Sequence, residues 1–242
     1  MDVNENRSSV LGPLSGRVTV ACAAAVLGAL LAASAAVAPS ASASPSGLRA
    51  SVDWAAGMTF GPVANVGPGA VADCTLAAVA DVEQVLARET EPIDPTPFVA
   101  AYDALARAAG EVPGPRSGLR PADVLAAWRA GEIAGTKVRA ARLASLDVTT
   151  VERALEAGPL YAVLQLPAPA STAPTWVDAS GVALSAWSRT APPAGYAQAG
   201  PHVVAVVGYD SADVLVATWG FVQPIAWSQW TAMVTAAWSV GP

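Results

Sequence analysis

Two side chains of this sequence could together form a cysteine nucleophile site, Cys74 and His202. Cys74 lies in the segment 73–79, where we predict the first turn of a helix, and His202 is the chain's single histidine. A thiol attacks a carbonyl carbon when an imidazole takes its proton and later passes it to the leaving group. The N-terminus of a helix favours this chemistry, because its unpaired N–H groups and dipole stabilise a thiolate.

Capping and periodicity predict the helix that would position Cys74. Asp73 is the expected N-cap, with a carboxylate that would accept hydrogen bonds from the first backbone N–H groups. Apolar residues then recur every three or four positions up to Leu86, which is typical of a core-facing helix, and we expect it to end near Arg88. Further helices are predicted over 98–109, over 121–131 and from a capping box at Thr149-x-x-Glu152 to Gly158.

The sequence changes character after residue 160. Segment 160–166 is apolar, 202–208 is apolar and rich in β-branched residues, and 214–219 returns from a turn at 209–213, so the last two predict a β-hairpin. The remaining predictions are an extended stretch over 135–141, a long loop over 167–199 and a final helix from Ser228 through Ala237. Helices followed by strands indicate an α+β domain with two halves packed against each other.

The first 43 residues have the pattern of a secretory signal peptide. Arg7 and Arg17 flank a polar start, an uncharged run follows, and Ala41-x-Ala43 predicts cleavage after Ala43. A retained membrane anchor is the less favoured alternative, because the run is rich in alanine and only weakly hydrophobic. We therefore expect a signal peptide over 1–43, an irregular arm over 44–59 and one domain over 60–242, secreted from a bacterial cell.

Charge and cysteine content restrict the partners. The chain has a formal net charge of −6, which argues against nucleic acid, and no basic run suggests membrane binding after cleavage. Cys22 would leave with the signal peptide, so Cys74 would be the single thiol of the mature chain and could form no intramolecular disulfide. One cysteine and one histidine are too few for a usual zinc site. We expect no metal, no cofactor and a monomer.

Three ordered blocks resemble papain-like cysteine peptidases, in particular the C39-like branch with its phage and actinobacterial secreted members. The first is the block 72–78, Ala-Asp-Cys-Thr-Leu-Ala-Ala, which matches the family's Gly-Asp-Cys-x-x-Ala-Ala. The second is 200–204, Gly-Pro-His-Val-Val, followed by 207–210, Val-Gly-Tyr-Asp. The third is Thr218-Trp219-Gly220, which matches the family's Trp-Gly pair. The resemblance covers roughly residues 60 to 240.

The resemblance implies a papain-like fold, with a central helix that begins at Cys74 in an N-terminal helical half and an antiparallel C-terminal β half. It also implies hydrolysis of amide bonds by a Cys74–His202 dyad without a cofactor. The papain branch has Asn two residues before the Trp, where this chain has Ala217. Candidates to orient His202 instead are Thr218, Asp210 and Asp213, and Asn65 is a candidate oxyanion donor.

Two functions from different classes fit these residues. The first is a secreted cysteine hydrolase that attacks peptide or other amide bonds, with a peptide or protein as substrate. The second is a secreted binding domain that has kept the fold without catalysis, with partner contacts on the loop 167–199. Cys74 and His202 favour the first function, and Ala217 at the expected Asn position favours the second.

Overall fold

The computed structural model describes residues 47–61, 63–64, 71–166 and 200–242, all within the compact unit Ser40–Pro242. The predicted signal peptide, Asn65 and the loop 167–199 lie outside the described residues. The helices are α1 (Cys74–Ala87), α2 (Thr96–Ala108), α3 (Pro121–Ala130), α4 (Val148–Ala157) and α5 (Trp227–Met233). None of the helices in the described ranges is long and apolar enough to cross a membrane.

The described strands form one antiparallel sheet. They are β1 (Val52–Asp53), β2 (Arg139–Arg142), β3 (Leu160–Leu166), β4 (Gly200–Tyr209), β5 (Asp213–Thr218), β6 (Phe221–Ala226) and β7 (Val234–Gly241). Their order is β2-β7-β3-β4-β5-β6, and β1 pairs with β4. Strands β4 and β5 form the predicted hairpin, so the strand that contains His202 lies in the interior of the sheet.

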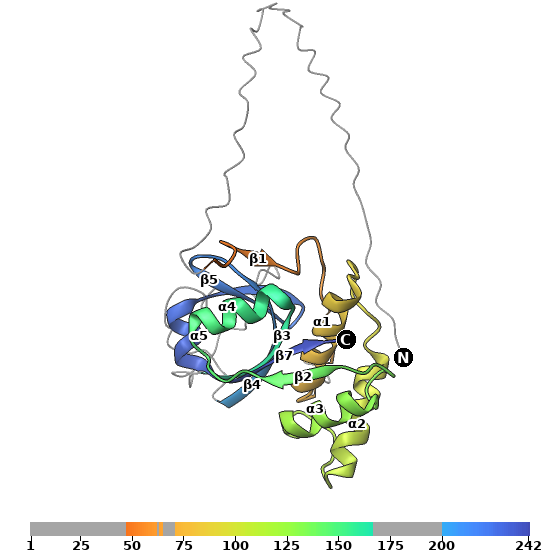
Figure 1. Cartoon of the computed structure of the whole chain (residues 1–242). Coiled ribbons are helices and arrows are strands. Elements are labelled where there is room, and N and C mark those ends of the chain that lie inside the picture. Colours follow the sequence, from red (N-terminus) through yellow and green to blue (C-terminus); the bar gives the residue numbers. More distant parts are fainter. Residues whose placement is uncertain (1–46, 62, 65–70, 167–199) are drawn as a thin grey trace, which may run out of the picture. The chain divides into compact units, whose positions relative to one another are not determined.

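The two faces of the sheet pack against different helices. In Figure 1, α1, α2 and α3 gather on one side, and α4 and α5 on the other. Val203, Ala205 and Val207 of β4 belong to the core that includes α1, whereas Val204 and Val206 belong to the second core. This separation follows from the alternation of side chains along a strand, and it makes β4 the shared wall of both cores.

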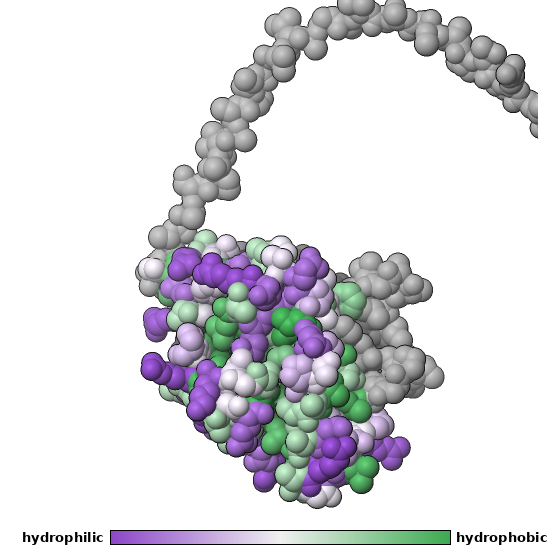
Figure 2. Space-filling model, turned by 90° about the vertical axis from the view of Figure 1, so that its right-hand side faces the viewer, coloured by the Kyte–Doolittle hydropathy of each residue, from purple (hydrophilic) through white to green (hydrophobic). Residues whose placement is uncertain are grey.

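The outer surface on the right-hand side of Figure 1 mixes residues of both kinds. In Figure 2, hydrophilic residues surround smaller groups of hydrophobic ones across this face. Among the large hydrophobic residues of the described ranges, Val112 is highly exposed, at 81%. Most other large apolar side chains of the described ranges are therefore in the two cores.

Three predicted details of the C-terminal half and α4 are wrong. The final helix ends at Met233 instead of Ala237, because the next residues form β7, which pairs with both β2 and β3. Strand β6 was not predicted, since it contains Pro224, which is tolerated at the edge of a sheet. The capping box at Thr149 is not used, because Asp147 caps α4 and accepts a hydrogen bond from the Thr150 N–H at 2.9 Å.

The described part of the predicted arm, 47–59, is mostly irregular but is fixed to the sheet. Its two-residue strand β1 pairs with the end of β4, and the Trp54 N–H donates to the Val207 carbonyl at 2.8 Å. This close approach requires glycine at position 208, since a Cβ there would lie 2.2 Å from the Val52 carbonyl oxygen. The arm therefore braces the strand that contains His202.

Candidate active site

Cys74 is the first residue of α1, as predicted, and Asp73 occupies the N-cap position without a side-chain cap. Its carboxylate instead accepts a hydrogen bond from the Ala64 N–H at 3.3 Å, so the predicted role of this side chain as a cap is wrong. The Asp73 carbonyl accepts from the N–H groups of Leu76 and Ala77. The backbone N–H groups of Cys74 and Thr75 lower the pKa of the Cys74 thiol.

The environment of Cys74 opposes ionisation of the thiol in the resting protein. Burial raises the pKa of Cys74, and the Asp73 carboxylate adds to this effect. Hydrogen bonds from the backbone of Val203, Thr75 and Cys74 lower the pKa, but they only partly offset burial. The residue nevertheless keeps partial solvent exposure. The backbone groups at the start of α1 thus lower the pKa of the thiol, as predicted, but burial raises it by more.

His202 lies near the start of β4 and is 3% exposed. Its Nε2 lies 2.8 Å from Thr218 Oγ1, and its ring stacks on Trp219 with a centroid distance of 4.4 Å and an interplanar angle of 15°. Burial lowers the pKa of His202 to about 3, so the imidazole is neutral in ordinary buffers. A neutral imidazole held at Nε2 could accept a proton at Nδ1.

A strained turn places Trp219 over the imidazole. Strand β5 ends at Thr218 and β6 begins at Phe221, and the two residues between them have φ values of 51° (Trp219) and 85° (Gly220). Positive φ at both central positions is the pattern of a type I′ hairpin turn. Glycine adopts it freely, whereas tryptophan does so at a cost of about 1–2 kcal/mol. Such strain in the backbone is found mostly at functional sites.

Val203 connects the helical half to the strand of His202. Its backbone lowers the pKa of the Cys74 thiol, so the thiol lies near the residue that follows the histidine. Val203 faces the core of α1, whereas His202 starts the opposite row of β4 and lies under Trp219. The imidazole and the core that contains α1 therefore lie on opposite faces of β4, and the backbone of Val203 is the part of this strand that acts on the thiol.

Ala217, at the position of the papain-branch Asn, and the candidates Asp210 and Asp213 lie in different parts of the sheet. Ala217 pairs with Ala205 in the core that includes α1, and its methyl group has no polar atom to offer. Asp210 and Asp213 lie at the turn of the β4–β5 hairpin, where Asp210 accepts hydrogen bonds from the Ala212 and Asp213 N–H groups. Eight residues of extended chain, roughly 26 Å, separate Asp210 from His202. The proposal that Asp210 or Asp213 orients His202 is wrong, and Thr218 is the candidate in contact.

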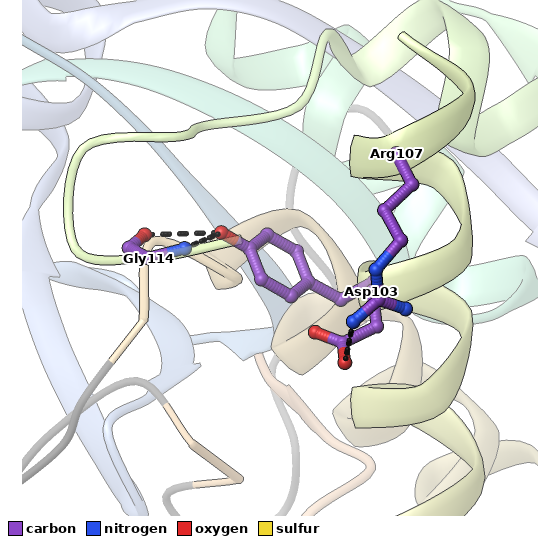
Figure 3. A network of polar contacts seen from close by, with 4 residues as sticks. Asp103, Arg107 and Gly114 are labelled. Carbon is purple, nitrogen blue, oxygen red and sulfur yellow. Dashed lines mark hydrogen bonds and ion pairs between the residues drawn. The ribbon is translucent and has the colours of Figure 1, made fainter. Parts of the chain in front are cut away.

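A second layer of hydrogen bonds fixes the segment before Cys74. The Gly114 carbonyl accepts hydrogen bonds from the Ala72 N–H and the Tyr102 hydroxyl, both at 3.0 Å. The Tyr102 hydroxyl also accepts from the Gly114 N–H at 3.1 Å. Figure 3 shows this contact beside the exposed Asp103–Arg107 pair of α2. Helix α2 thereby holds the backbone two residues before the thiol.

Two buried hydroxyl groups near the thiol were missed in the sequence. Tyr161 of β3 is fully buried, packs between Trp128 and Trp238, and has no hydrogen-bond partner for its hydroxyl. Burial, and then the charge of a Cys74 thiolate, raise the pKa of Tyr161. The hydroxyl of Thr75 is also buried without a partner. No local pattern marks Tyr161, because only the pairing of β3 with β4 and β7 brings it near Cys74.

The chemistry available here is that of a thiol and an imidazole. Within the described ranges, no group of three or more His, Cys, Asp or Glu side chains could hold a metal ion. The donors nearest the thiol are the first N–H groups of α1 and the N–H of Val203. Donors of this kind can stabilise the negative charge that develops on a carbonyl oxygen under attack.

We compared the sequence and the fold with those of known proteins. No protein-family profile matches the sequence, and no curated protein sequence matches it. The structure is similar to xylellain, a cysteine protease from Xylella fastidiosa, with a TM-score of 0.56 and 14% identity over 80% of this chain and 86% of that chain. The fold is papain-like. The predicted α+β architecture, with helices that start at Cys74 and an antiparallel C-terminal sheet, is confirmed.

A second solved structure aligns over a similar share of the chain. It is the Carica candamarcensis cysteine protease CMS1MS2 in complex with E-64, with a TM-score of 0.43 and 14% identity over 80% of this chain and 97% of that chain. At 14% identity the similarity to xylellain establishes the papain-like fold alone. The chemistry of this chain depends on its own residues.

Proposed function

We propose that this protein is a secreted papain-like cysteine hydrolase that cleaves peptide or related amide bonds. The observation that supports this most is the place of Cys74, at the first turn of α1, where the backbone of Val203, the residue after His202, lowers the pKa of the thiol. Cys74 acts as the nucleophile, His202 as the general base and acid, and Thr218 as the residue that positions His202. Xylellain, which has a similar fold, is described as a cysteine protease, and peptides are the substrates that this implies.

The proposed reaction starts from neutral groups. The Cys74 proton moves to Nδ1 of His202 as the sulfur attacks the carbonyl carbon and forms a C–S bond. This direction requires the hydrogen on Nε2, which donates to Thr218 Oγ1 in that tautomer. Collapse of the tetrahedral intermediate breaks the C–N bond, and the imidazolium passes its proton to the departing amine. Water then hydrolyses the thioester with His202 as base, and the proton returns to Cys74.

A second function, binding without catalysis, has its own support. Burial raises the pKa of Cys74 and lowers that of His202 to about 3, so the resting site contains no thiolate–imidazolium ion pair. Ala217 also supplies no polar group. A secreted binding domain with this fold would retain both residues for packing.

Incubation with a peptide library made from a digested proteome separates the two functions, with new termini identified by mass spectrometry. The hydrolase predicts new termini with the wild type and none with Cys74→Ala. Ser239→Ala, which changes an exposed hydroxyl of β7, should match the wild type. Equal products from wild type and Cys74→Ala, or no products from either, would leave only the binding function.

The branch and the compartment are also proposals. The 72–78 block and the 200–204 block support the C39-like branch, and the pattern of 1–43 supports export with cleavage after Ala43. The mass of the protein recovered from the culture medium tests the export directly. A mature N-terminus at Ser44 is expected, and a chain retained in the cell membrane would contradict it.

A further inference from the structure

A cavity of about 320 Å³ lies beside α1, away from the thiol. The described lining consists of Phe60, Gly61 and Val63, of Pro92, Ile93 and Pro95, and of Ala80, Asp81 and Gln84 from α1. Asp81 follows Cys74 by seven residues, which is roughly 10 Å along a helix. The volume is about ten times the liquid volume of one water molecule, near the lower limit for cavities that bind small molecules.

Asp81 is the unusual residue of this cavity. It is 4% exposed, and no hydrogen bond or ion pair joins it to a described residue; burial is the single cause that raises the pKa of its carboxyl group. A buried carboxyl group without a partner destabilises a protein by several kcal/mol when ionised. Protonation does not remove the problem, because the acid form also lacks a hydrogen-bond partner.

The second polar group of the cavity is an acceptor as well. Both amide hydrogens of Gln84 are used, one donated to the Thr59 carbonyl at 2.8 Å and one to the Glu89 carbonyl at 3.1 Å. This fixes the amide and leaves its oxygen as an acceptor. None of the described residues that line the cavity has a cationic side chain. Among the described side chains that line the cavity, the polar groups thus offer acceptors and the others are apolar.

We propose that this cavity binds a small organic ammonium compound, with its cationic nitrogen on Asp81 and its apolar body against Phe60, Val63 and Ile93. An ammonium group supplies the donors and the positive charge that both acceptors need. A neutral alcohol supplies one donor without charge, and a hydrocarbon supplies none. This site is separate from the thiol and does not depend on the proposed hydrolysis.

Isothermal titration calorimetry with benzylammonium, and with benzyl alcohol as its neutral counterpart, tests the site. The wild type should bind benzylammonium with a stoichiometry of one, and benzyl alcohol about tenfold more weakly or worse. Asp81→Asn keeps the shape and removes the charge, and should weaken benzylammonium binding by about tenfold or more. Glu91→Gln, which removes an exposed charge beside the cavity, should bind like the wild type.

A second variant guards against a folding defect in Asp81→Asn. Ile93→Trp changes a partly exposed position of the cavity wall, keeps Asp81, and should also weaken benzylammonium binding by reducing the volume. Absence of binding to the wild type at millimolar benzylammonium would overturn the proposal. Equal affinities of the wild type, Asp81→Asn and Ile93→Trp would overturn it too.

Discussion

The helical half and the β half hold their polar groups in different ways. On α1, the buried Asp81 and the buried Thr75 hydroxyl have no hydrogen-bond partner among the described residues, and backbone groups lower the pKa of Cys74. In the β half, His202 has Thr218 on one ring nitrogen and Trp219 stacked on its face. The imidazole is therefore held in place by side chains before any substrate arrives, while the thiol is adjacent to unused hydrogen-bonding groups.

This difference assigns separate tasks to the two halves. A base must be held in one tautomer and orientation, which the buried contacts of His202 provide. A nucleophile must change from a neutral thiol to a thioester. A sulfur with few hydrogen bonds to side chains is suited to that change. Unused donors beside it can bond to charge that appears only during the reaction. The predictions below test this division from its largest consequence to its smallest.

Removal of the imidazole should have the largest effect on hydrolysis. His202→Ala deletes the general base and should lower kcat/KM by about 10²–10⁴-fold, measured on any peptide that the library identifies. Added imidazole should restore part of the rate, because the variant leaves space under Trp219. Activity of His202→Ala within about twofold of the wild type would show that the β half supplies no base.

Acid should destabilise the protein through His202. Its pKa is about 3 in the folded protein against 6.5 ordinarily, so the unfolded chain binds the proton first as pH falls. The stabilisation is complete above pH 6.5 and is lost towards pH 3, by roughly 5 kcal/mol at most. Urea unfolding across this range should show a smaller loss for His202→Gln. The same slope in both proteins would contradict the account.

The buried carboxyl group of α1 should have the opposite pH dependence. The folded-state pKa of Asp81 lies well above 3.8, so its contribution is present below pH 3.8 and is lost as pH rises through the folded-state pKa. Asp81→Asn should therefore be more stable than the wild type at neutral pH in urea unfolding. A less stable Asp81→Asn at neutral pH, with no ligand added, would show that the ionised group has a partner.

Thr218 should have a moderate effect. Thr218→Val keeps the shape and removes the hydrogen bond to Nε2, which contributes about 1 kcal/mol, so kcat should fall by roughly fivefold with little change in KM. Thr218→Ser keeps the hydroxyl and should recover most of the rate. If Thr218→Val and Thr218→Ser are equally slow, packing explains the residue and positioning does not.

Tyr161 should have the smallest effect on stability. Tyr161→Phe removes a buried hydroxyl without a partner, so the free energy of unfolding should stay the same or rise by up to about 1 kcal/mol. If this hydroxyl bonds to charge that develops beside Cys74, kcat should nevertheless fall. A variant that loses stability and keeps its full rate would assign the hydroxyl a structural role.

The sequence predicted the positions of Cys74 and His202 because each depends on local signals. An apolar stripe that follows a capping residue marks the start of α1, and a β-branched run marks β4. The contacts of Thr218 with His202 were predicted only as one of several alternatives. The residue that orients His202 could not be selected without the register of β4 and β5. This register places Asp210 and Asp213 at the far end of the hairpin.

The errors lie where pairing between distant strands overrides local preference. Alanine favours a helix after residue 233, yet β7 is extended because it fills the gap between β2 and β3. Asp81 is another case. An acidic residue inside a helix is usually exposed, whereas the packing around α1 leaves Asp81 only 4% exposed.

The approach of Cys74 and His202 is the central claim, and the single histidine makes it directly measurable. ¹⁵N NMR of protein labelled with [¹⁵N]histidine gives one Nδ1 and one Nε2 resonance, recorded before and after Cys74 is alkylated with iodoacetamide. The account predicts that alkylation shifts Nδ1 and leaves Nε2, held by Thr218, nearly unchanged. If Nδ1 stays unchanged while the label on Cys74 is complete, the thiol and the imidazole do not form a dyad.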